Sequence, residues 1–425
     1  MKARPGYPDP SPPLVRRLAY GFICWLNRHP RLIRAAAAWL RAWPSWGGAR
    51  VAARRAAVEQ VLSRPASFSN TSHAPNLVAG DFLIGMEPGL RYDADKVIFQ
   101  SVLASLQVQA DADLEASTRI QHLRSGGRLN TFDLVEQYLV WVVLRALAPG
   151  FGAAAETVLA GSRGCNPDDR LALHYMLEVR HVAANLFGGA NAPADVQRRA
   201  EMSAASLHAR MQKSLPELSM SWRGAAGQPF GALHRNAIGL AWVSHPVTVQ
   251  AAALVVQELL GRRAEYQLLR NEALALGIDV WTNPGWRILV RKHVLELMRF
   301  RPVFPALARD VPRQTEFMSG ARRNPVCPAG SSVAVLSLSA MFDQSATPDA
   351  DAYHPQRNWG NQEAARYLMF GFGERRCPAM EEALTILTSA LIGVLTLPEL
   401  RLAGPWGRPV QYDGPMVRRM YLRPR

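Results

Sequence analysis

One cysteine, Cys377, lies among residues that suit a metal-bound thiolate. The segment reads Phe370-Gly-Phe-Gly-Glu-Arg-Arg-Cys377-Pro-Ala. Gly371 and Gly373 allow the backbone to turn tightly and to approach a flat cofactor, where a Cβ atom would clash. Arg375 can pair with a carboxylate of such a cofactor or favour the ionised sulfur. Phe370 can keep water away from the sulfur, which tunes a bound metal.

An apolar helical pattern over residues 380–395 follows Cys377 closely. The positive end of that helix would favour negative charge on the sulfur. The alternative interpretation is structural: a glycine-rich turn before a helix, holding a buried and unreactive cysteine. A short motif stays a hypothesis until the rest of the chain supplies context.

The rest of the chain resembles the cytochrome P450 family at four signatures. The cysteine segment matches the family's Phe-x-x-Gly-x-Arg-x-Cys-x-Gly at every fixed position except the last, where Ala379 replaces glycine. Glu296-Leu-Met-Arg299 resembles the Glu-x-x-Arg motif, whose acid and base share one helix face. Tyr353-His-Pro-Gln-Arg357 resembles the segment whose arginine completes a buried cluster with Glu296 and Arg299.

The fourth signature runs from Phe300 to Arg309 and resembles the family's continuation into its first sheet. The resemblance implies that the cofactor is haem b (iron protoporphyrin IX) and that Cys377 is the axial ligand of its iron. It also implies that four residues contact the cofactor: Phe370, Gly373, Arg375 and Arg309. Arg309 is expected to bind a haem propionate.

The fold implied by the resemblance is the cytochrome P450 fold, mostly α with a small β lobe. The haem is expected between a long central helix and the cysteine loop with the helix that follows it. We predict a single domain over residues 1–425, because no linker, repeat or low-complexity tract divides the chain. Alternation in Val333-Ala-Val-Leu336 predicts a strand.

The segment from Met86 to Lys96 departs from the family pattern. The family usually carries Asp-Pro-Pro-x-His here, with an arginine four residues later. Arg91 falls at the histidine position and Asp95 at the arginine position. Since propionates are anions, Arg91 is expected to pair with one, with Lys96 as the alternative, whereas an aspartate cannot.

The central helix, about residues 232–260, also departs from the pattern. Oxygen-activating members carry an acid and a threonine there, but no Asp or Glu occurs from residue 233 to residue 257. Pro246 removes a backbone hydrogen bond, at a cost of about 3 kcal/mol, and predicts a kink.

The proton-capable side chains near that proline are Ser244, His245 and Thr248. An imidazole is a competent proton donor near neutral pH, so these three are the candidate catalytic residues. The alternative is structural: the histidine packs in the core and the threonine bonds to a helix carbonyl.

Three functions remain open. The first is a monooxygenase that hydroxylates a small apolar or lipid-like substrate, with His245 and a nearby hydroxyl in place of the acid–threonine pair. The second is a peroxide-dependent fatty-acid hydroxylase, or a hydroperoxide isomerase or lyase, which needs no redox partner. The third is a non-catalytic haem-binding or scaffold protein. The substrate is expected to contact apolar residues: Phe82, Leu83, Ile84, Val303, Phe304 and Ala306.

The formal net charge is +15. No recognition helix, zinc-finger spacing or RNA-binding signature is present, so nucleic acid is not an expected partner. Excess positive charge suits an acidic redox partner of the ferredoxin or flavodoxin type, docking near Arg366, Arg375 and Arg376. Four widely spaced cysteines, with no Cys-x-x-Cys pair, favour a reducing, cytoplasmic compartment.

The N-terminal segment, residues 1–50, is basic and amphipathic. Its apolar stretch from Leu18 to Leu26 is too short to cross a bilayer, which needs about 20 residues. We therefore expect no transmembrane anchor. The segment either packs on the body of the protein with its arginines in water or contacts a membrane surface.

Overall fold

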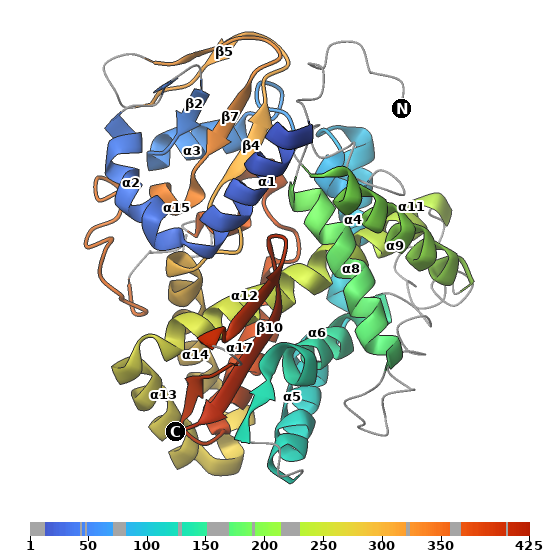
Figure 1. Ribbon diagram of the computed structural model, residues 1–425, viewed down its shortest axis with the longest axis vertical. Coiled ribbons are helices and arrows are strands. Elements are labelled where there is room, and N and C mark those ends of the chain that lie inside the picture. The colour runs from blue at the N-terminus through green and yellow to red at the C-terminus, as the bar shows by residue number, and fades with distance from the viewer. Residues whose placement is uncertain are drawn as a thin grey trace. The chain divides into compact units, whose positions relative to one another are not determined.

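The computed structural model describes residues 13–42, 45–46, 49–70, 82–125, 130–150, 170–188, 192–213, 230–319, 324–357, 367–404 and 407–425. Its helices and strands are labelled in Figure 1. The chain forms two compact units. Unit 1 comprises Met1–Lys96, Asn185–Arg198 and Pro302–Pro378, and unit 2 comprises Val97–Ala184, Arg199–Arg301 and Ala379–Arg425. Since the chain passes repeatedly from one unit to the other, neither is a continuous segment, and a single domain over 1–425 stays a prediction.

Unit 1 is built on a four-stranded sheet in the order β1-β2-β7-β4 (Figure 1). β2 and β7 pair in parallel, and the other two pairs are antiparallel. The strand predicted at Val333 is present as β7, with Val333 and Val335 buried and Ala334 exposed. The elements are α1 (Pro13–Arg28), α2 (Pro30–Ala42), β1 (Ser45–Trp46), β2 (Ala49–Ala52), α3 (Arg55–Ser63), the beginning of α4 (Leu90–Ser105), β4 (Leu307–Asp310), β5 (Thr315–Glu316), β6 (Val326–Cys327), β7 (Ser332–Val335) and α15 (Ser337–Met341).

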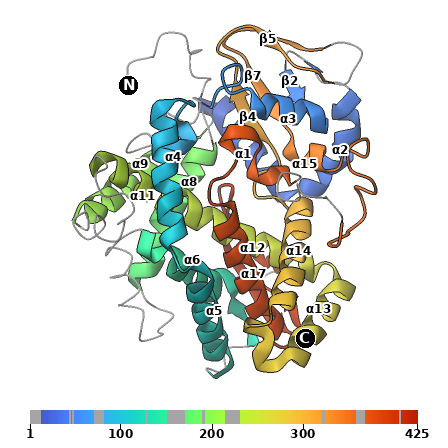
Figure 2. The ribbon, with the colours of Figure 1, turned by 180° about the vertical axis from the view of Figure 1, so that it is seen from behind.

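Unit 2 is mostly helical, with a small sheet in the order β3-β10-β8 and β9 paired to β10. The apolar helix α17 packs on α5, α12, α13 and α14, and Figure 2 shows it beside α14. The elements are α5 (Val108–Ser125), β3 (Phe132–Asp133), α6 (Val140–Leu147), α8 (Arg170–Gly188), α9 (Ala194–Lys213), α11 (Phe230–Gly239), α12 (His245–Leu260), α13 (Arg263–Leu276), α14 (Pro284–Phe300), α17 (Met380–Thr396), β8 (Leu400–Leu402), β9 (Val410–Asp413) and β10 (Met416–Pro424).

Close contacts fix α17 in the core of unit 2. The Tyr138 hydroxyl donates to the carbonyl of Ala390 over 2.9 Å. A Cβ atom at Gly393 would lie 2.1 Å from that hydroxyl oxygen, so only glycine permits the approach. Arg287 of α14 pairs with Asp113 of α5 and donates to Ser389 of α17 over 3.2 Å. These bonds join α5, α14 and α17 into one packed group.

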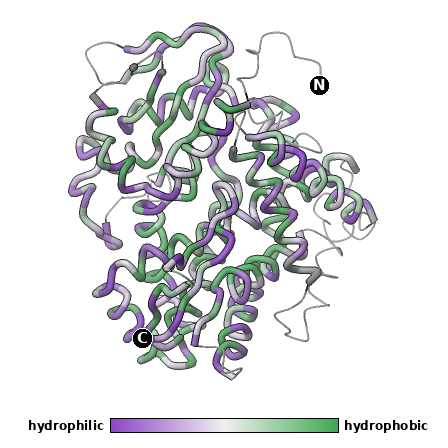
Figure 3. Tube along the Cα trace, in the orientation of Figure 1, coloured by the Kyte–Doolittle hydropathy of each residue, from purple (hydrophilic) through white to green (hydrophobic). Residues whose placement is uncertain are grey.

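The central helix contains a π-helical turn at Leu240–Ser244, between α11 and α12. The turn directly precedes His245 and Pro246, where the sequence predicts a kink. A proline leaves a carbonyl in the preceding turn without its backbone donor, and a widened turn accommodates that loss. By length and composition Gly231–Leu260 could span a membrane, but 83% of its most apolar window is buried in the protein, as in a core helix. The many hydrophobic residues of α12 can be followed in Figure 3, in the orientation of Figure 1.

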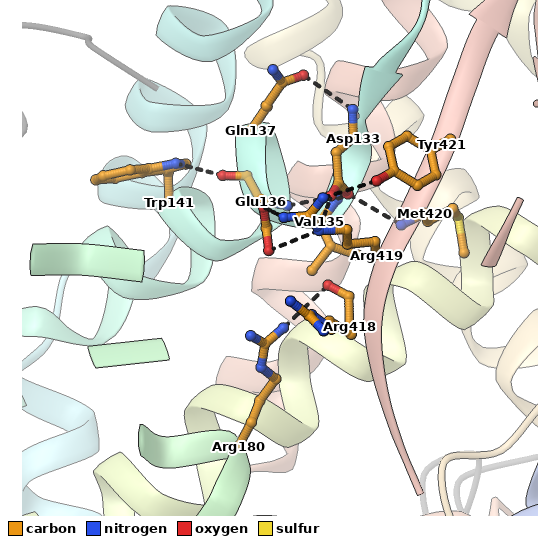
Figure 4. Close-up of polar contacts among 10 residues, drawn as sticks. All are labelled: Asp133, Val135, Glu136, Gln137, Trp141, Arg180, Arg418, Arg419, Met420 and Tyr421. Carbon is orange, nitrogen blue, oxygen red and sulfur yellow. Dashed lines mark hydrogen bonds and ion pairs between the residues drawn. The ribbon is translucent and has the colours of Figure 1, made fainter. Parts of the chain in front are cut away.

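A charged cluster joins β3 to β10 in unit 2 (Figure 4). The buried Asp133 accepts backbone N–H bonds from Val135 at 3.0 Å and from Met420 at 3.1 Å. Arg419 lies 3.7 Å from Asp133 Oδ2 and 3.1 Å from Glu136 Oε2. Burial raises the pKa of Asp133 to about 6, although the Met420 bond acts to lower it. The carboxyl therefore binds its proton more tightly in the folded state.

Asp133→Asn should change how stability depends on pH. Because the folded pKa lies above the unfolded value of 3.8, the contribution of Asp133 to the free energy of unfolding of the wild type should fall as pH rises from about 4 to about 6. The variant should lack this fall, which is at most about 3 kcal/mol. Urea unfolding of both proteins across that range measures the effect, and parallel pH profiles would contradict the role assigned to Asp133.

Candidate functional site

The cysteine loop of unit 1 is a closed turn that presents Cys377 at the surface of the chain. Gly371 and Gly373 have φ of 80° and 70°, a left-handed conformation that favours glycine. The backbone N–H of Cys377 donates to the carbonyl of Phe370 over 2.8 Å. The Cys377 side chain is exposed and is in no disulfide, and Phe370 beside it is half-buried. The loop therefore has the backbone shape and the accessible sulfur that thiolate ligation requires.

The end of α3 supports this loop. A Cβ atom at Gly373 would lie 3.1 Å from Ser63 Cα and 3.5 Å from the carbonyl oxygen of Leu62. The sequence suggests that Gly373 is needed for close approach to a cofactor. The structure supplies a second reason, because a larger residue would also push the loop away from α3.

Two residues of α4 hold the loop from another direction. The Tyr92 hydroxyl donates to the carbonyl of Glu374 over 3.2 Å, and Lys96 Nζ donates to the same oxygen over 2.8 Å. The Tyr92 ring lies 5.5 Å from the guanidinium carbon of Arg375. Burial raises the pKa of the Tyr92 hydroxyl, which stays a donor at neutral pH. Sequence reasoning missed Tyr92, whose only signal was an aromatic residue next to Arg91.

Arg375 is buried beside the loop and points toward the segment that precedes α4. Its guanidinium donates to the carbonyl of Met86 and, at 3.4 Å, to that of Leu83. Glu87 Oε2 lies 3.8 Å from Arg375 Nη1, but that carboxylate side chain is 39% exposed. Burial lowers the pKa of Arg375, and Glu87 only partly offsets the effect.

Arg309 is a second buried guanidinium in the same region. It lies on β4 and donates to the carbonyl of Ala308 over 2.8 Å. Burial, together with the positive charge of Arg375, lowers the pKa of Arg309 to about 10. The carboxylates of Glu87 and Asp310 act to raise it. Two buried cations that repel each other thus have two partly exposed carboxylates near them, Glu87 and Asp310.

This arrangement fits a dianionic cofactor. Buried guanidiniums need charged partners, and carboxylates are the partners they bind most strongly. A haem carries two propionates, and a thiolate loop lies beside both arginines. Arg309 and Arg375 could therefore hold the propionates while Cys377 holds the iron.

Arg91 differs from these two arginines in its surroundings. Its side chain is exposed on α4, whereas Asp95 is almost fully buried. The predicted pairing of Arg91 with a propionate stays a prediction. Lys96, its alternative, contacts the cysteine loop instead.

The Glu-x-x-Arg pair is present in unit 2. Arg299 Nη2 lies 2.7 Å from Glu296 Oε1 and Arg299 Nε lies 3.0 Å from Glu296 Oε2, with both side chains at most 1% exposed. This is a buried two-point ion pair, unlike an ordinary surface i, i+3 pair. Arg357 lies in unit 1, where its guanidinium donates to the carbonyls of Asp349 and Ala352. Its membership of the cluster stays a prediction.

His245 is fully buried in unit 2. Its Nε2 lies 3.3 Å from the carbonyl oxygen of Val140, and its ring stacks on Tyr175 with centroids 5.6 Å apart. Burial lowers the pKa of His245 to about 4, although the hydrogen bond to the Val140 carbonyl acts to raise it. The ring is therefore neutral at pH 7 and is an unfavourable proton donor. A histidine that packs in the core has such surroundings. They favour the structural alternative given above for His245 over a role as proton donor.

The accessible side chains in the middle of the central helix are different ones. Val243, Ser244 and Val247 are partly exposed, whereas Thr248 is buried. Of the three candidate catalytic residues, Ser244 is thus the one that solvent or a ligand can reach. Val243, Ser244 and Val247 form an accessible strip on the helix, and Ser244 is its polar member.

Apolar side chains of unit 1 include most of the predicted substrate contacts. Phe82, Leu83 and Val303 are buried, Ile84 and Phe304 are half-exposed, and Ala306 is exposed. The Phe304 ring packs against the tilted ring of Phe187 of α8, with ring centroids 4.3 Å apart. Phe187 was not predicted, because it is distant in sequence. Residues 71–81, which directly precede Phe82, lie outside the described residues.

A sequence model of the family described as Cytochrome P450 matches residues 288–399. That stretch includes the Glu296–Arg299 ion pair of unit 2 and, in unit 1, Arg309, Arg375 and Cys377. Over that stretch the chain is similar to the cytochrome P450 family. The predicted fold class is confirmed by P450 crystal structures over nearly the whole chain. CalO2 has a TM-score of 0.67 at 17% identity and covers 98% of each chain. CYP109E1 from Bacillus megaterium, in complex with testosterone, has a TM-score of 0.68 at 14% identity, over 92% of this chain and 98% of that one.

Curated P450s match a shorter stretch. Cytochrome P450 11B1, mitochondrial, of Rattus norvegicus is 28% identical over 150 residues, which are 34% of this chain and 29% of the relative. Cytochrome P450 11B2, mitochondrial, of the same organism is 28% identical over 153 residues. The match thus spans less than a third of the length of these P450s.

Arg309→Met should have opposite effects on haem retention and on the haem-free protein. Loss of a charged hydrogen bond should speed haem dissociation about 10-fold or more. The unfolding free energy of the haem-free protein should stay equal or rise, because a poorly compensated buried charge is gone. Haem transfer to an apoglobin and urea unfolding measure the two quantities.

Arg375→Met should behave like Arg309→Met, and Arg313→Met is the matched control, since Arg313 is exposed on the same unit. Arg91→Met tests the predicted role of Arg91 in the same assay. Haem retention at the wild-type rate in both Arg309→Met and Arg375→Met would refute the proposed propionate site.

Proposed function

We propose that this protein is a haem-thiolate monooxygenase that hydroxylates a small apolar or lipid-like substrate. The observation that carries the proposal is the exposed Cys377 in a loop turned by two glycines, beside two buried guanidiniums whose carboxylate neighbours, Glu87 and Asp310, are partly exposed. We propose haem b because two arginines suit two propionates and the sequence has no Cys-x-x-Cys-His attachment motif. Bound haem supplies the oxidising chemistry, which a thiolate ligand promotes by favouring O–O cleavage.

The cysteine loop is held by its neighbours so that the sulfur keeps its position. Tyr92 and Lys96 fix the Glu374 carbonyl, and α3 supports Gly373. Phe370, whose carbonyl accepts the backbone N–H of Cys377, would keep water away from the sulfur when haem is bound. Arg309 and Arg375 hold the propionates and thereby orient the cofactor against the loop.

We propose that Ser244 is the polar side chain that holds water and protons on the substrate side of the cofactor. It is the accessible hydroxyl in an otherwise apolar strip with Val243 and Val247. His245 acts through packing, by supporting the π-helical turn from which Ser244 projects. Thr248, being buried, is the weaker of the two hydroxyl candidates.

The redox partner proposed for this reaction is an acidic ferredoxin or flavodoxin. Arg375 is buried and serves the cofactor, so the partner would use other basic residues near the loop. Arg64, Lys96 and Arg376 are half-buried in unit 1, and Arg366 lies outside the described residues. We place the protein in the cytoplasm, where the Cys377 thiol would stay reduced.

A peroxide-driven reaction is the second candidate. It is favoured by the absence of any carboxylate from residue 233 to residue 257, since a fatty-acid carboxylate could supply the missing acid. Such an enzyme would use a fatty acid and hydrogen peroxide, and a related hydroperoxide isomerase or lyase would use the lipid hydroperoxide alone. Neither needs electrons from a partner.

Purified protein should be assayed in three arms with the same panel of apolar substrates and fatty acids. The arms contain a ferredoxin and its reductase with NADPH, hydrogen peroxide alone, or a fatty-acid hydroperoxide alone. We expect hydroxylated product in the first arm. Product confined to the second or third arm would support the peroxide reaction instead, and haem-loaded protein without product in any arm would support a non-catalytic role.

Ser244→Ala should lower product formed per NADPH consumed by about 10-fold or more, because proton delivery is lost while electrons still arrive. His245→Gln keeps a neutral polar side chain and should leave this ratio near the wild type. The His245 variant should instead lose the acid-induced fall in stability below about pH 6, which arises because an imidazole of depressed pKa takes up a proton on unfolding. The reverse pattern, with coupling lost only in His245→Gln, would return the proton role to His245.

A further inference from the structure

The first helix exposes a continuous apolar stripe. Leu14, Leu18, Phe22 and Trp25 are between 44% and 69% exposed. Their spacing places them on one face of α1, within an arc of about 80° at 100° per residue. The rings of Phe22 and Trp25 stack with centroids 6.0 Å apart. A contiguous exposed patch of large apolar side chains marks a binding surface more often than isolated residues do.

The same helix uses another face to pack on the protein. Tyr20 and Cys24 of α1 are buried. Arg17, at the edge of the stripe, lies 3.7 Å from Asp195 in the same unit. The apolar stripe is therefore not the face with which α1 packs on the rest of unit 1.

The second helix repeats this arrangement. Ile33 and Ala37 are buried, and Arg34 lies over the Phe342 ring at 4.4 Å. Leu32 and Trp39 are 46% and 47% exposed on the other side. Both N-terminal helices thus bury one apolar face in unit 1 and expose a second one.

The charge of this region identifies the partner. The stretch Pro13–Ala42 contains six arginines and no acidic residue: Arg16, Arg17, Arg28, Arg31, Arg34 and Arg41. Arg17 and Arg31 are exposed. Apolar and aromatic side chains beside arginines are typical of helices that lie in the interface of an anionic membrane, where the basic groups meet lipid phosphates.

We infer that α1 and α2 bind this protein to the surface of an anionic phospholipid membrane. The apolar stripe enters the boundary between headgroups and acyl chains, and the arginines contact the headgroups. Helices of 16 and 13 residues are too short to cross the bilayer, and each has a face occupied by the protein. The attachment is therefore peripheral, reversible and weakened by salt.

The test is sedimentation of the haem-loaded protein with vesicles of phosphatidylcholine, with and without phosphatidylglycerol. We expect binding to the anionic vesicles, weaker binding to the neutral ones, and release at high salt. Combined Phe22→Asp and Trp25→Asp should weaken binding at least about 10-fold, since each substitution removes a large apolar side chain that the membrane would bury. Combined Arg17→Gln and Arg31→Gln should weaken binding to anionic vesicles several-fold and change binding to neutral vesicles little.

Ile278→Asp is the matched control, because Ile278 is 87% exposed in unit 2, outside the N-terminal helices. Haem content and circular dichroism confirm that each variant is folded. Wild-type protein that fails to sediment with anionic vesicles overturns the inference. Vesicle binding that the Phe22→Asp and Trp25→Asp variant leaves unchanged also overturns it. A dimer in solution that Phe22→Asp dissociates, without any vesicle binding, overturns it as well.

Discussion

The site depends on the burial of two like charges, Arg309 and Arg375, next to the cysteine loop. Two guanidiniums out of water repel each other, and the nearby Glu87 carboxylate is partly solvated. Burying such charges is unfavourable unless counter-charges complete them. The fold maintains this arrangement through β4, which carries Arg309, and through the carbonyls of Leu83 and Met86, which orient Arg375. A bound dianion would remove the conflict, so cofactor binding and local stability are expected to be coupled.

The other contacts of the cysteine loop hold its backbone in position and do not balance the charge of the two arginines. Gly373 meets α3, and Tyr92 and Lys96 meet at a single carbonyl. Each contact is modest, but together they come from separate segments of unit 1 and restrict the loop to one conformation. An exposed sulfur held in this way can bind a metal without a large rearrangement of the backbone.

Local patterns in the sequence predicted part of this. The glycines at 371 and 373, the helix after Cys377 and the Glu296–Arg299 pair follow from short spacings, and the structure contains all of them. The contributions of Glu87, Tyr92 and Phe187 were not predicted, because they depend on contacts between distant segments that carry no local signal. Pro246 predicted a disturbed helix, but whether the chain would kink or widen into a π-helical turn depends on the packing around it.

His245 shows the limit of reading chemistry from residue type. An imidazole next to a proline in a helix without acids suggested a proton donor. The structure surrounds it with Tyr175 and the Val140 carbonyl, and burial lowers its pKa to about 4. Side-chain direction on a helix with a π-helical turn cannot be counted at 100° per residue, so the neighbouring Ser244 reaches the accessible strip instead.

The most direct test of the account is the ferrous–CO absorption spectrum of freshly purified protein, compared with that of Cys377→His. The wild type should show the long-wavelength Soret band that a sulfur ligand opposite CO produces, and the variant should show the shorter-wavelength band of a nitrogen ligand. A native wild-type protein with the nitrogen-type band, or a variant that keeps the sulfur-type band, would contradict ligation by Cys377.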